Sequence, residues 1–163
     1  MGILGIYLAN SVRDSLVANV RFRLEEEARI TAEASRPLLS QGDDMNVFAN
    51  RLGQQIDARV TIIAPDGKVL GDSQENPSTM ENHASRPEVK DALASGWGES
   101  TRYSATLGKQ MMYVAVPVSN QDKILGVARV ALPLTAVENS VKQVTLTVSL
   151  AMAITAILAM LAA

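Results

Sequence analysis

The feature that most constrains this chain is the uncharged segment VTLTVSLAMAITAILAMLAA, residues 144–163. Only four hydroxyl side chains interrupt its apolar character. A hydrocarbon core of about 30 Å is crossed by roughly 20 helical residues, which is the length of this segment. The segment therefore predicts a transmembrane helix, and the alternative is a C-terminal helix that is buried in an oligomer.

The N-terminus carries a shorter apolar segment, MGILGIYLA, which is followed by Asn10. This segment is too short to span a bilayer, and it lacks the basic residues and the cleavage pattern of a secretory signal peptide. We interpret residues 1–9 as the outer end of a truncated first transmembrane helix, and the alternative is a helix that packs on the body of the protein. Residues 10–143 would then form a domain attached at both ends to the same side of the cell membrane.

Composition excludes several classes of function. The net charge is −2 and charged residues make up 20% of the chain, so no basic surface predicts binding to nucleic acid. The absence of cysteine rules out disulfides, thiolate nucleophiles and thiolate metal sites. His83 is the only histidine, which argues against a catalytic triad and against a multi-histidine metal site. We expect this chain to hold no metal and no cofactor.

The segment that follows the N-terminus predicts a long amphipathic helix over residues 12–38. It has no glycine and no proline before Pro37, where we expect the helix to end. Small and apolar residues recur at spacings of three and four and so share one helical face. A rod longer than a small domain needs either carries a signal across distance or pairs with a copy of itself. The residues expected on this homodimer face are Val17, Val20, Leu24, Ala28 and Leu38.

The middle of the chain predicts an α+β domain with an antiparallel sheet of about five strands. A second helix over residues 45–56 precedes a β-hairpin, whose strands at residues 58–64 and 69–73 flank the turn sequence PDGK. A polar loop then leads into a short helix from Pro87 to Gly96. Hairpin-linked strands with helices outside the run are typical of α+β domains. The remaining strands are expected at residues 98–105, 110–118 and 124–133.

Four blocks occur in order along the chain: RVTIIAPDGKVLGDS, MENHASRPEVKDAL, GESTRYSATLGKQMMYVAVPV and LGVARVALPL. Together they resemble the extracytoplasmic sensor region of PhoR-type histidine kinases, the phosphate-regulon sensors with a single PAS-like (Cache or PDC) domain. The resemblance covers residues 10–143 and implies a PAS-like fold, with a long N-terminal helix and a C-terminal helix that continues into a transmembrane segment. It also implies a dimeric membrane receptor that controls a cytoplasmic autokinase. Kinase motifs are missing from this sequence, so we expect the chain itself not to be an enzyme.

The ligand pocket of PAS-like sensors lies between the sheet and the loop or short helix that covers it. Arg86 and Arg102 would suit a small anionic ligand, because a guanidinium offers paired donors to a carboxylate or a phosphate. Arg102 and Tyr103 are neighbours on a strand and point to opposite faces, so a pocket filled by the protein's own side chains is the alternative. The matching positions are His83, Arg86, Trp97, Arg102, Tyr103, Ser104 and Tyr113.

A second group of residues is expected to hold the polar loop in place. Asp72 ends a strand and Arg86 starts the short helix, and we predict an ion pair between them that closes the loop. His83 is expected to fix the same loop by hydrogen bonds. Arg129 interrupts an apolar strand, and we interpret it as an outward-facing position on a half-buried sheet. The positions assigned a structural role are Asp72, Ser73, Asn82 and Pro87.

The sequence thus predicts a signal-input domain of a two-component sensor histidine kinase. Binding of a ligand or of an envelope protein would shift the balance between two arrangements of the helices that enter the membrane. One alternative is a protein-docking module that binds no small molecule, with Trp97 as part of an exposed apolar patch. Another is the input domain of a chemoreceptor.

Overall fold

The computed structural model describes residues 2–104, 107–121 and 123–161. Met1 and residues 162 and 163, which end the two predicted membrane segments, lie outside the described residues, as does the predicted strand end at residue 105. The chain divides into two compact units, Met1–Val20 with Leu134–Ala163, and Arg21–Pro133. The long helix α1 (Gly2–Gln41) contributes residues to both units.

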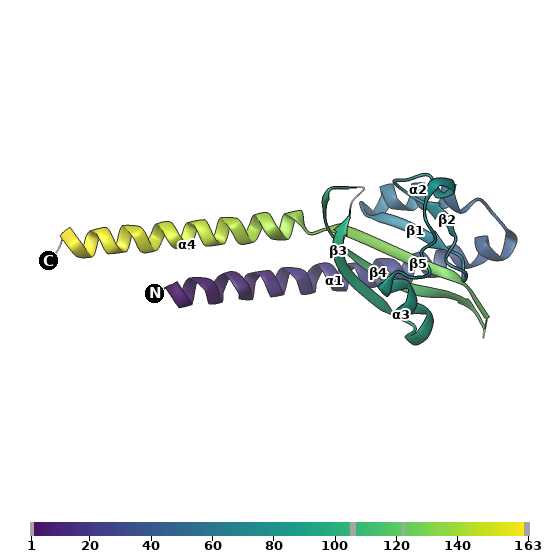
Figure 1. Cartoon of the computed structure of the whole chain (residues 1–163), viewed down its shortest axis with the longest axis horizontal. Helices are drawn as coiled ribbons and strands as arrows, with labels where there is room; N and C mark the ends of the chain where they lie inside the picture. Colours follow the sequence, from purple (N-terminus) through teal and green to yellow (C-terminus); the bar gives the residue numbers. More distant parts are fainter. Residues whose placement is uncertain (1, 105–106, 122, 162–163) are drawn as a thin grey trace. The chain divides into compact units, whose positions relative to one another are not determined.

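The first unit pairs the N-terminal part of α1 with α4 (Thr135–Leu161), and the two helices lie side by side (Figure 1). A Cβ atom at Gly5 would lie 3.1 Å from Cγ1 of Val148, so the glycine allows a close approach. Among the described residues, no helix is both long enough and apolar enough to cross a membrane. The transmembrane assignment of residues 144–163 stays a prediction.

The second unit is built on a five-stranded antiparallel sheet with the strand order β2-β1-β5-β4-β3. The sequence-based α+β assignment with five antiparallel strands is therefore confirmed, with strand ends shifted by only a residue or two. The strands are β1 (Arg59–Ile63), β2 (Val69–Asp72), β3 (Gly98–Ser104), β4 (Lys109–Asn120) and β5 (Lys123–Pro133).

One face of the sheet is covered by the second half of α1, next to which lies α2 (Met45–Ile56). Along α1, Arg21 lies 3.9 Å from Glu99 of β3, and Leu39 approaches Gly126 of β5, so the helix crosses the sheet. Leu24 and Ala28 are fully buried in this layer. The sequence predicted that this apolar face pairs with a second chain. At Leu24 and Ala28 the face is instead buried within the same chain. The other predicted dimer positions, Val17, Val20 and Leu38, are half-buried.

The end of α1 differs from the sequence-based expectation, because Pro37 lies inside the helix. The helix continues to Gln41 and is followed by Gly42, whose φ of +76° is in the left-handed region. The backbone N–H of Asp43 donates to the carbonyl of Leu38 at 3.0 Å and closes the last turn. Proline removes one backbone hydrogen bond from the helix, and α1 continues for four residues beyond it.

The opposite face of the sheet carries α3 (Pro87–Ser95) and the polar loop with the 3₁₀-helix η1 (Pro77–Thr79). Gly98 lets α3 press on β3, because a Cβ atom there would lie 2.1 Å from the carbonyl oxygen of Glu88. The loop is tied to the β1–β2 turn by two hydrogen bonds. Asn82 Nδ2 donates to the carbonyl oxygen of Asp66 at 2.9 Å. The backbone N–H of His83 donates to the carbonyl oxygen of Gly67 at 2.8 Å.

We expect Leu24→Ala to lower the free energy of unfolding by about 2–5 kcal/mol, because it opens a cavity in the layer between α1 and the sheet. The matched control is Val47→Ala on α2, which shortens a side chain that is 64% exposed and should change stability by less than about 0.5 kcal/mol. Urea unfolding of the two variants measures the difference. Equal effects would contradict the placement of Leu24 in the core.

Candidate ligand-binding site

A cavity of about 180 Å³ lies on the face of the sheet that carries the polar loop. It brings together six of the seven residues predicted to bind a ligand, whereas Trp97 does not line it. Tyr103 is 61% exposed, so only its strand neighbours Arg102 and Ser104 face the interior. We call this space the arginine cavity, and it is lined by Arg59, Met80, His83, Arg86, Arg102, Tyr103, Ser104, Tyr113 and Arg129.

Strand register explains why residues far apart in the sequence meet here. Thr61 of β1 pairs with Arg129 of β5, and Ser100 of β3 pairs with Tyr113 of β4. Cross-strand partners project from the same face of a sheet, and alternate residues share that face. Arg129 is only 2% exposed, so the interpretation of this residue as outward-facing is wrong. Because both faces of β5 are covered, a polar residue on this strand lies in the interior.

Glu88 holds the side of the cavity next to α3. Its carboxylate is fully buried and accepts hydrogen bonds from Ser100 Oγ at 2.6 Å, Arg102 Nη2 at 2.9 Å and Arg129 Nη1 at 3.2 Å. Arg129 also donates from Nη2 to Thr61 Oγ1 at 3.0 Å. A buried charge is stable only when it is paired and hydrogen-bonded, and these contacts meet that requirement.

Asp72 holds the opposite side through Arg59. The Nε of Arg59 lies 3.1 Å from both carboxylate oxygens of Asp72, and Thr61 Oγ1 donates to the same carboxylate at 2.7 Å. The backbone N–H groups of Gln74 and Glu75 donate to it as well. The predicted Asp72–Arg86 ion pair is therefore wrong, because Asp72 is engaged by Arg59. Arg86 instead lies 3.6 Å from the exposed Glu81.

Two arginines stack on one aromatic ring inside the cavity. The guanidinium carbon of Arg102 lies 3.9 Å from the ring centroid of Tyr113, and that of Arg129 lies 5.1 Å from it. These distances are those of cation–π contacts. Within the described part of the chain, the Nε atoms of Arg102 and Arg129 are buried and have no hydrogen-bond partner. Both arginines line the cavity through other atoms of their side chains.

The charges of the site follow from its contacts. Burial alone would raise the pKa of Glu88, but the hydrogen bond from Ser100 and the charges of Arg129 and Arg102 outweigh it and lower that pKa. Burial lowers the pKa of Arg129 to about 10, with Glu88 opposing the shift. Both groups are thus charged at neutral pH.

His83 is buried and is the least basic group of the cavity. Burial, followed by the charges of Arg129 and Arg86, lowers the pKa of His83 to about 4. Its Nδ1 lies 2.8 Å from the carbonyl oxygen of Glu81, within the loop. The imidazole is therefore neutral at neutral pH, and the positive potential comes from arginine alone.

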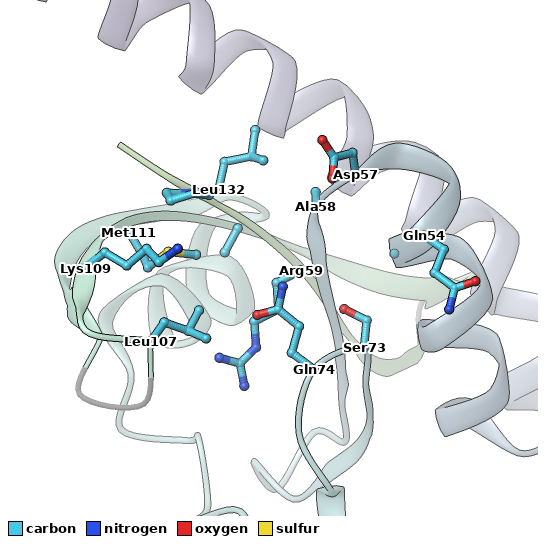
Figure 2. Close-up of a pocket in the computed structure, with 13 residues that line it drawn as sticks. Gln54, Asp57, Ala58, Arg59, Ser73, Gln74, Leu107, Lys109, Met111 and Leu132 are labelled. Carbon is cyan, nitrogen blue, oxygen red and sulfur yellow. The ribbon is translucent and has the colours of Figure 1, made fainter. Parts of the chain in front are cut away.

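A second cavity of about 610 Å³ has Arg59 in common with the arginine cavity, and Figure 2 shows its lining residues. In the close-up, Leu107, Lys109 and Met111 lie on one side, and Gln54 and Ser73 on the other. Ser73 also fixes the start of β1, because its Oγ accepts from the N–H of Val60 at 3.0 Å. No group of three or more potential metal ligands occurs among the residues that the structure describes.

Sequence reasoning missed four residues of the site. Arg59 and Arg129 lie on strands whose two faces are both buried, and Met80 lies in the polar loop. Glu88 does not line the cavity but fixes two of its arginines. The sequence did contain a signal for these residues. An arginine on a strand that is buried on both faces needs a buried carboxylate partner, so the two arginines could have indicated that acidic residues lie nearby.

Three solved sensor domains illustrate the similarity in fold. The V. cholerae histidine kinase DctB sensor domain matches with a TM-score of 0.62 at 24% identity, over 82% of this chain and 58% of that one. The ligand-binding domain of the Campylobacter jejuni chemoreceptor Tlp3, solved with 4-methylisoleucine, has a TM-score of 0.62 at 16% identity, over 83% and 58%. The E. coli DcuS sensor domain has a TM-score of 0.54 at 14% identity, over 81% and 98%.

The matched region spans 58% of the length of the first two of these structures. The search of curated proteins found no match to the sequence. The region matched by the family comparison includes the whole of the second unit. Residues 15–133 match the family described as single Cache-like. The expected single Cache fold is thereby confirmed, and this chain belongs to the single Cache-like family.

Proposed function

We propose that this chain is the extracytoplasmic sensor domain of a membrane-bound histidine kinase of the PhoR type, and that it binds a small anion in the arginine cavity. The observation that carries the proposal is the set of four arginines that line this cavity, Arg59, Arg86, Arg102 and Arg129. Guanidinium groups offer paired, charged donors to an oxyanion, and a bound anion would balance part of their positive charge. Inorganic phosphate and small carboxylates are the first ligands to test.

The similar structures support a receptor role. They are a sensor domain of a histidine kinase and sensory or ligand-binding domains of chemoreceptors, some of them solved with isoleucine or with GABA. A chemoreceptor input domain is therefore the second candidate, and the sequence that follows this domain in the full protein would decide between the two. In both cases we propose that the chain itself catalyses no reaction.

Transmission is proposed to run through the sheet. Arg102 lies on β3 and Arg129 on β5, and the other face of these two strands carries α1. A ligand that draws the polar loop onto these two arginines would therefore act on the sheet that supports α1. It can shift the receptor between two states only if it binds one of them more tightly.

We also propose that residues 144–163 anchor the chain in a membrane. Large apolar side chains at Leu150, Ile154 and Leu158 of α4 are 55–61% exposed, and lipid would cover them. A homodimer is proposed to use the outward face of α1, because Leu24 and Ala28 are occupied in the core of the chain. On that face Phe22 is 68% exposed and Ile30 is 60% exposed.

We expect Arg102→Gln to weaken anion binding by about 10- to 150-fold, which corresponds to the loss of one charged hydrogen bond. Isothermal titration calorimetry of the purified chain with phosphate and with a panel of small carboxylates measures this loss. The control is Arg21→Gln, which makes the same change of charge at an exposed position near Glu99. Equal loss in both variants would indicate nonspecific attraction, and no binding by the wild type would refute the proposed function.

The affinity for a small carboxylate should change less than about threefold between pH 6 and pH 8. The pKa of His83 is about 4 and that of Arg129 about 10, so neither group titrates in this window. Titrations at several pH values test this expectation, with His83→Gln as the comparison. A tenfold gain in wild-type affinity from pH 8 to pH 6, lost in His83→Gln, would show that His83 becomes protonated in the site.

Cysteines at position 22 or 30 should form disulfide crosslinks between two chains in membranes, whereas a cysteine at position 24 should not. Phe22→Cys and Ile30→Cys place the thiol on the exposed face of α1, and Leu24→Cys places it in the core. The sequence contains no cysteine, so no background thiol competes. Crosslinking at position 24 alone, or at none of the three, would contradict the proposed dimer face.

A further inference from the structure

The second cavity takes no part in the proposed function. Its volume of about 610 Å³ is more than three times that of the arginine cavity, and it lies within the range of about 300–1,000 Å³ that is typical of small-molecule sites. Arg59 is the only described residue that lines both cavities. The rim of the second cavity includes the exposed residues Gln54, Asp57, Gln74 and Lys109, so solvent reaches it.

One side of the second cavity is apolar. Leu107 precedes β4, Met111 lies on β4, and Leu132 lies near the end of β5. Leu107 packs against the buried cluster that contains Met111. Leu107 and Leu132 are only half-buried, so they keep apolar surface in contact with water. An apolar ligand group that covers this surface would therefore bind favourably.

The other side of the cavity, on the right in Figure 2, offers uncharged hydrogen-bonding groups. Gln54 lies in the last turn of α2, and Ser73 and Gln74 directly follow β2. Each glutamine amide can both donate and accept hydrogen bonds. Oγ of Ser73 accepts from the backbone N–H of Val60 at 3.0 Å, which leaves its hydroxyl proton available as a donor. A hydroxyl or amide group of a ligand would find both kinds of partner here.

The charges around the second cavity favour neither an anion nor a cation. The Nε of Arg59 lies 3.1 Å from Asp72, and both side chains are buried, so their charges balance each other. Asp57 and Lys109 carry opposite charges and lie on opposite sides of the cavity in Figure 2. Both are exposed, so water screens them. A charged ligand would lose hydration here without gaining a buried counterion.

We propose that the second cavity is a further ligand site, and that its ligand is an uncharged amphiphilic molecule. An apolar edge of this ligand would cover Leu107 and Leu132, and hydroxyl or amide groups on its opposite edge would bond to Gln54 and Gln74. The site is separate from the arginine cavity, and its occupancy requires no bound anion. The two cavities therefore take ligands of different chemistry.

Two walls of the second cavity are tied to the long helices. Nη2 of Arg23 on α1 donates at 2.7 Å to the carbonyl of Ile56, which ends α2, and the next residue, Asp57, lines the cavity. Pro133 also lines the cavity and ends β5, and α4 begins at Thr135. A ligand held between these walls shifts the receptor between its states if it binds one of them more tightly. The site thus acts as a second input to the receptor.

Three probes that share one ring test the ligand class. Cyclohexanecarboxamide is uncharged, cyclohexanecarboxylate is an anion, and cyclohexylmethylammonium is a cation. The full 163-residue chain is placed in lipid nanodiscs, because detergents are themselves amphiphiles, and binding is followed by the NMR signal of the Met111 methyl group. We expect the carboxamide to shift this signal and to bind about fivefold or more tightly than either charged probe. No shift with the carboxamide, or equal binding of a charged probe at Met111, would overturn the inference.

A substitution that fills the cavity gives a second test. Ala58 is buried and lines the cavity, so a larger side chain there takes up part of its volume. We expect Ala58→Leu to weaken carboxamide binding by about tenfold or more, while phosphate binding in the arginine cavity changes less than about twofold. Val47→Leu enlarges an exposed side chain on α2 and should change neither affinity. Undiminished carboxamide binding in Ala58→Leu would contradict the proposed site.

Two more variants keep the test decisive. Leu107→Ser removes a half-buried apolar contact and replaces the Ala58→Leu test if that variant does not fold; it should weaken carboxamide binding by about fivefold or more, and an unchanged affinity would overturn the inference. Arg102→Gln should weaken phosphate binding and leave carboxamide binding unchanged. Loss of carboxamide binding in Arg102→Gln would place the probe in the arginine cavity and refute the second site. If the carboxamide binds at Met111 and phosphate and the small carboxylates do not bind, the proposed function fails and this inference stands.

Discussion

The buried carboxylate of Glu88 is the contact on which the site depends. It lies in the first turn of α3 and accepts from Arg102 of β3 and Arg129 of β5, so it ties one helix to two strands. Gly98 makes the contact possible, because any larger residue would push α3 away from β3. Removing one partner of a buried ion pair leaves an unpaired charge, which costs about 3–5 kcal/mol. The cluster therefore fixes the positions of the two arginines before any ligand arrives.

Local patterns allowed most of the fold to be predicted, and long-range contacts explain the errors. Apolar, β-branched segments and turn residues predicted all five strands, and the helix expected over residues 45–56 is α2. Alternation shows which residues share a face, but it cannot tell whether that face is buried. The prediction for Arg129 was wrong for this reason. It assumed a sheet with one exposed face, whereas helices and a loop cover both faces of β5 and bury Arg129.

The site was predicted in part because the order of the sequence blocks defined which loop faces which strands. That order placed His83, Arg86 and Tyr113 together, which the structure also does. The order of the blocks could not show which charged groups pair. Asp72 was predicted to pair with Arg86, but in the folded sheet Asp72 lies next to Arg59. The apolar stripe of α1 likewise had two possible partners, another chain or its own sheet. At Leu24 the sheet accounts for the burial.

The rigidity of the sheet limits how a ligand could produce a signal. Arg102 and Arg129 lie on strands separated only by β4, and the hydrogen-bonded ladders on both sides of β4 keep β3 and β5 at a fixed separation there. Arg86 lies instead where the polar loop enters α3, and the loop is tied to the β1–β2 turn through Asn82 and His83. Few hydrogen bonds must break for such a segment to move. A difference in affinity between two receptor states is therefore expected to come from Arg86 and the loop closing on an anion that the sheet arginines already hold.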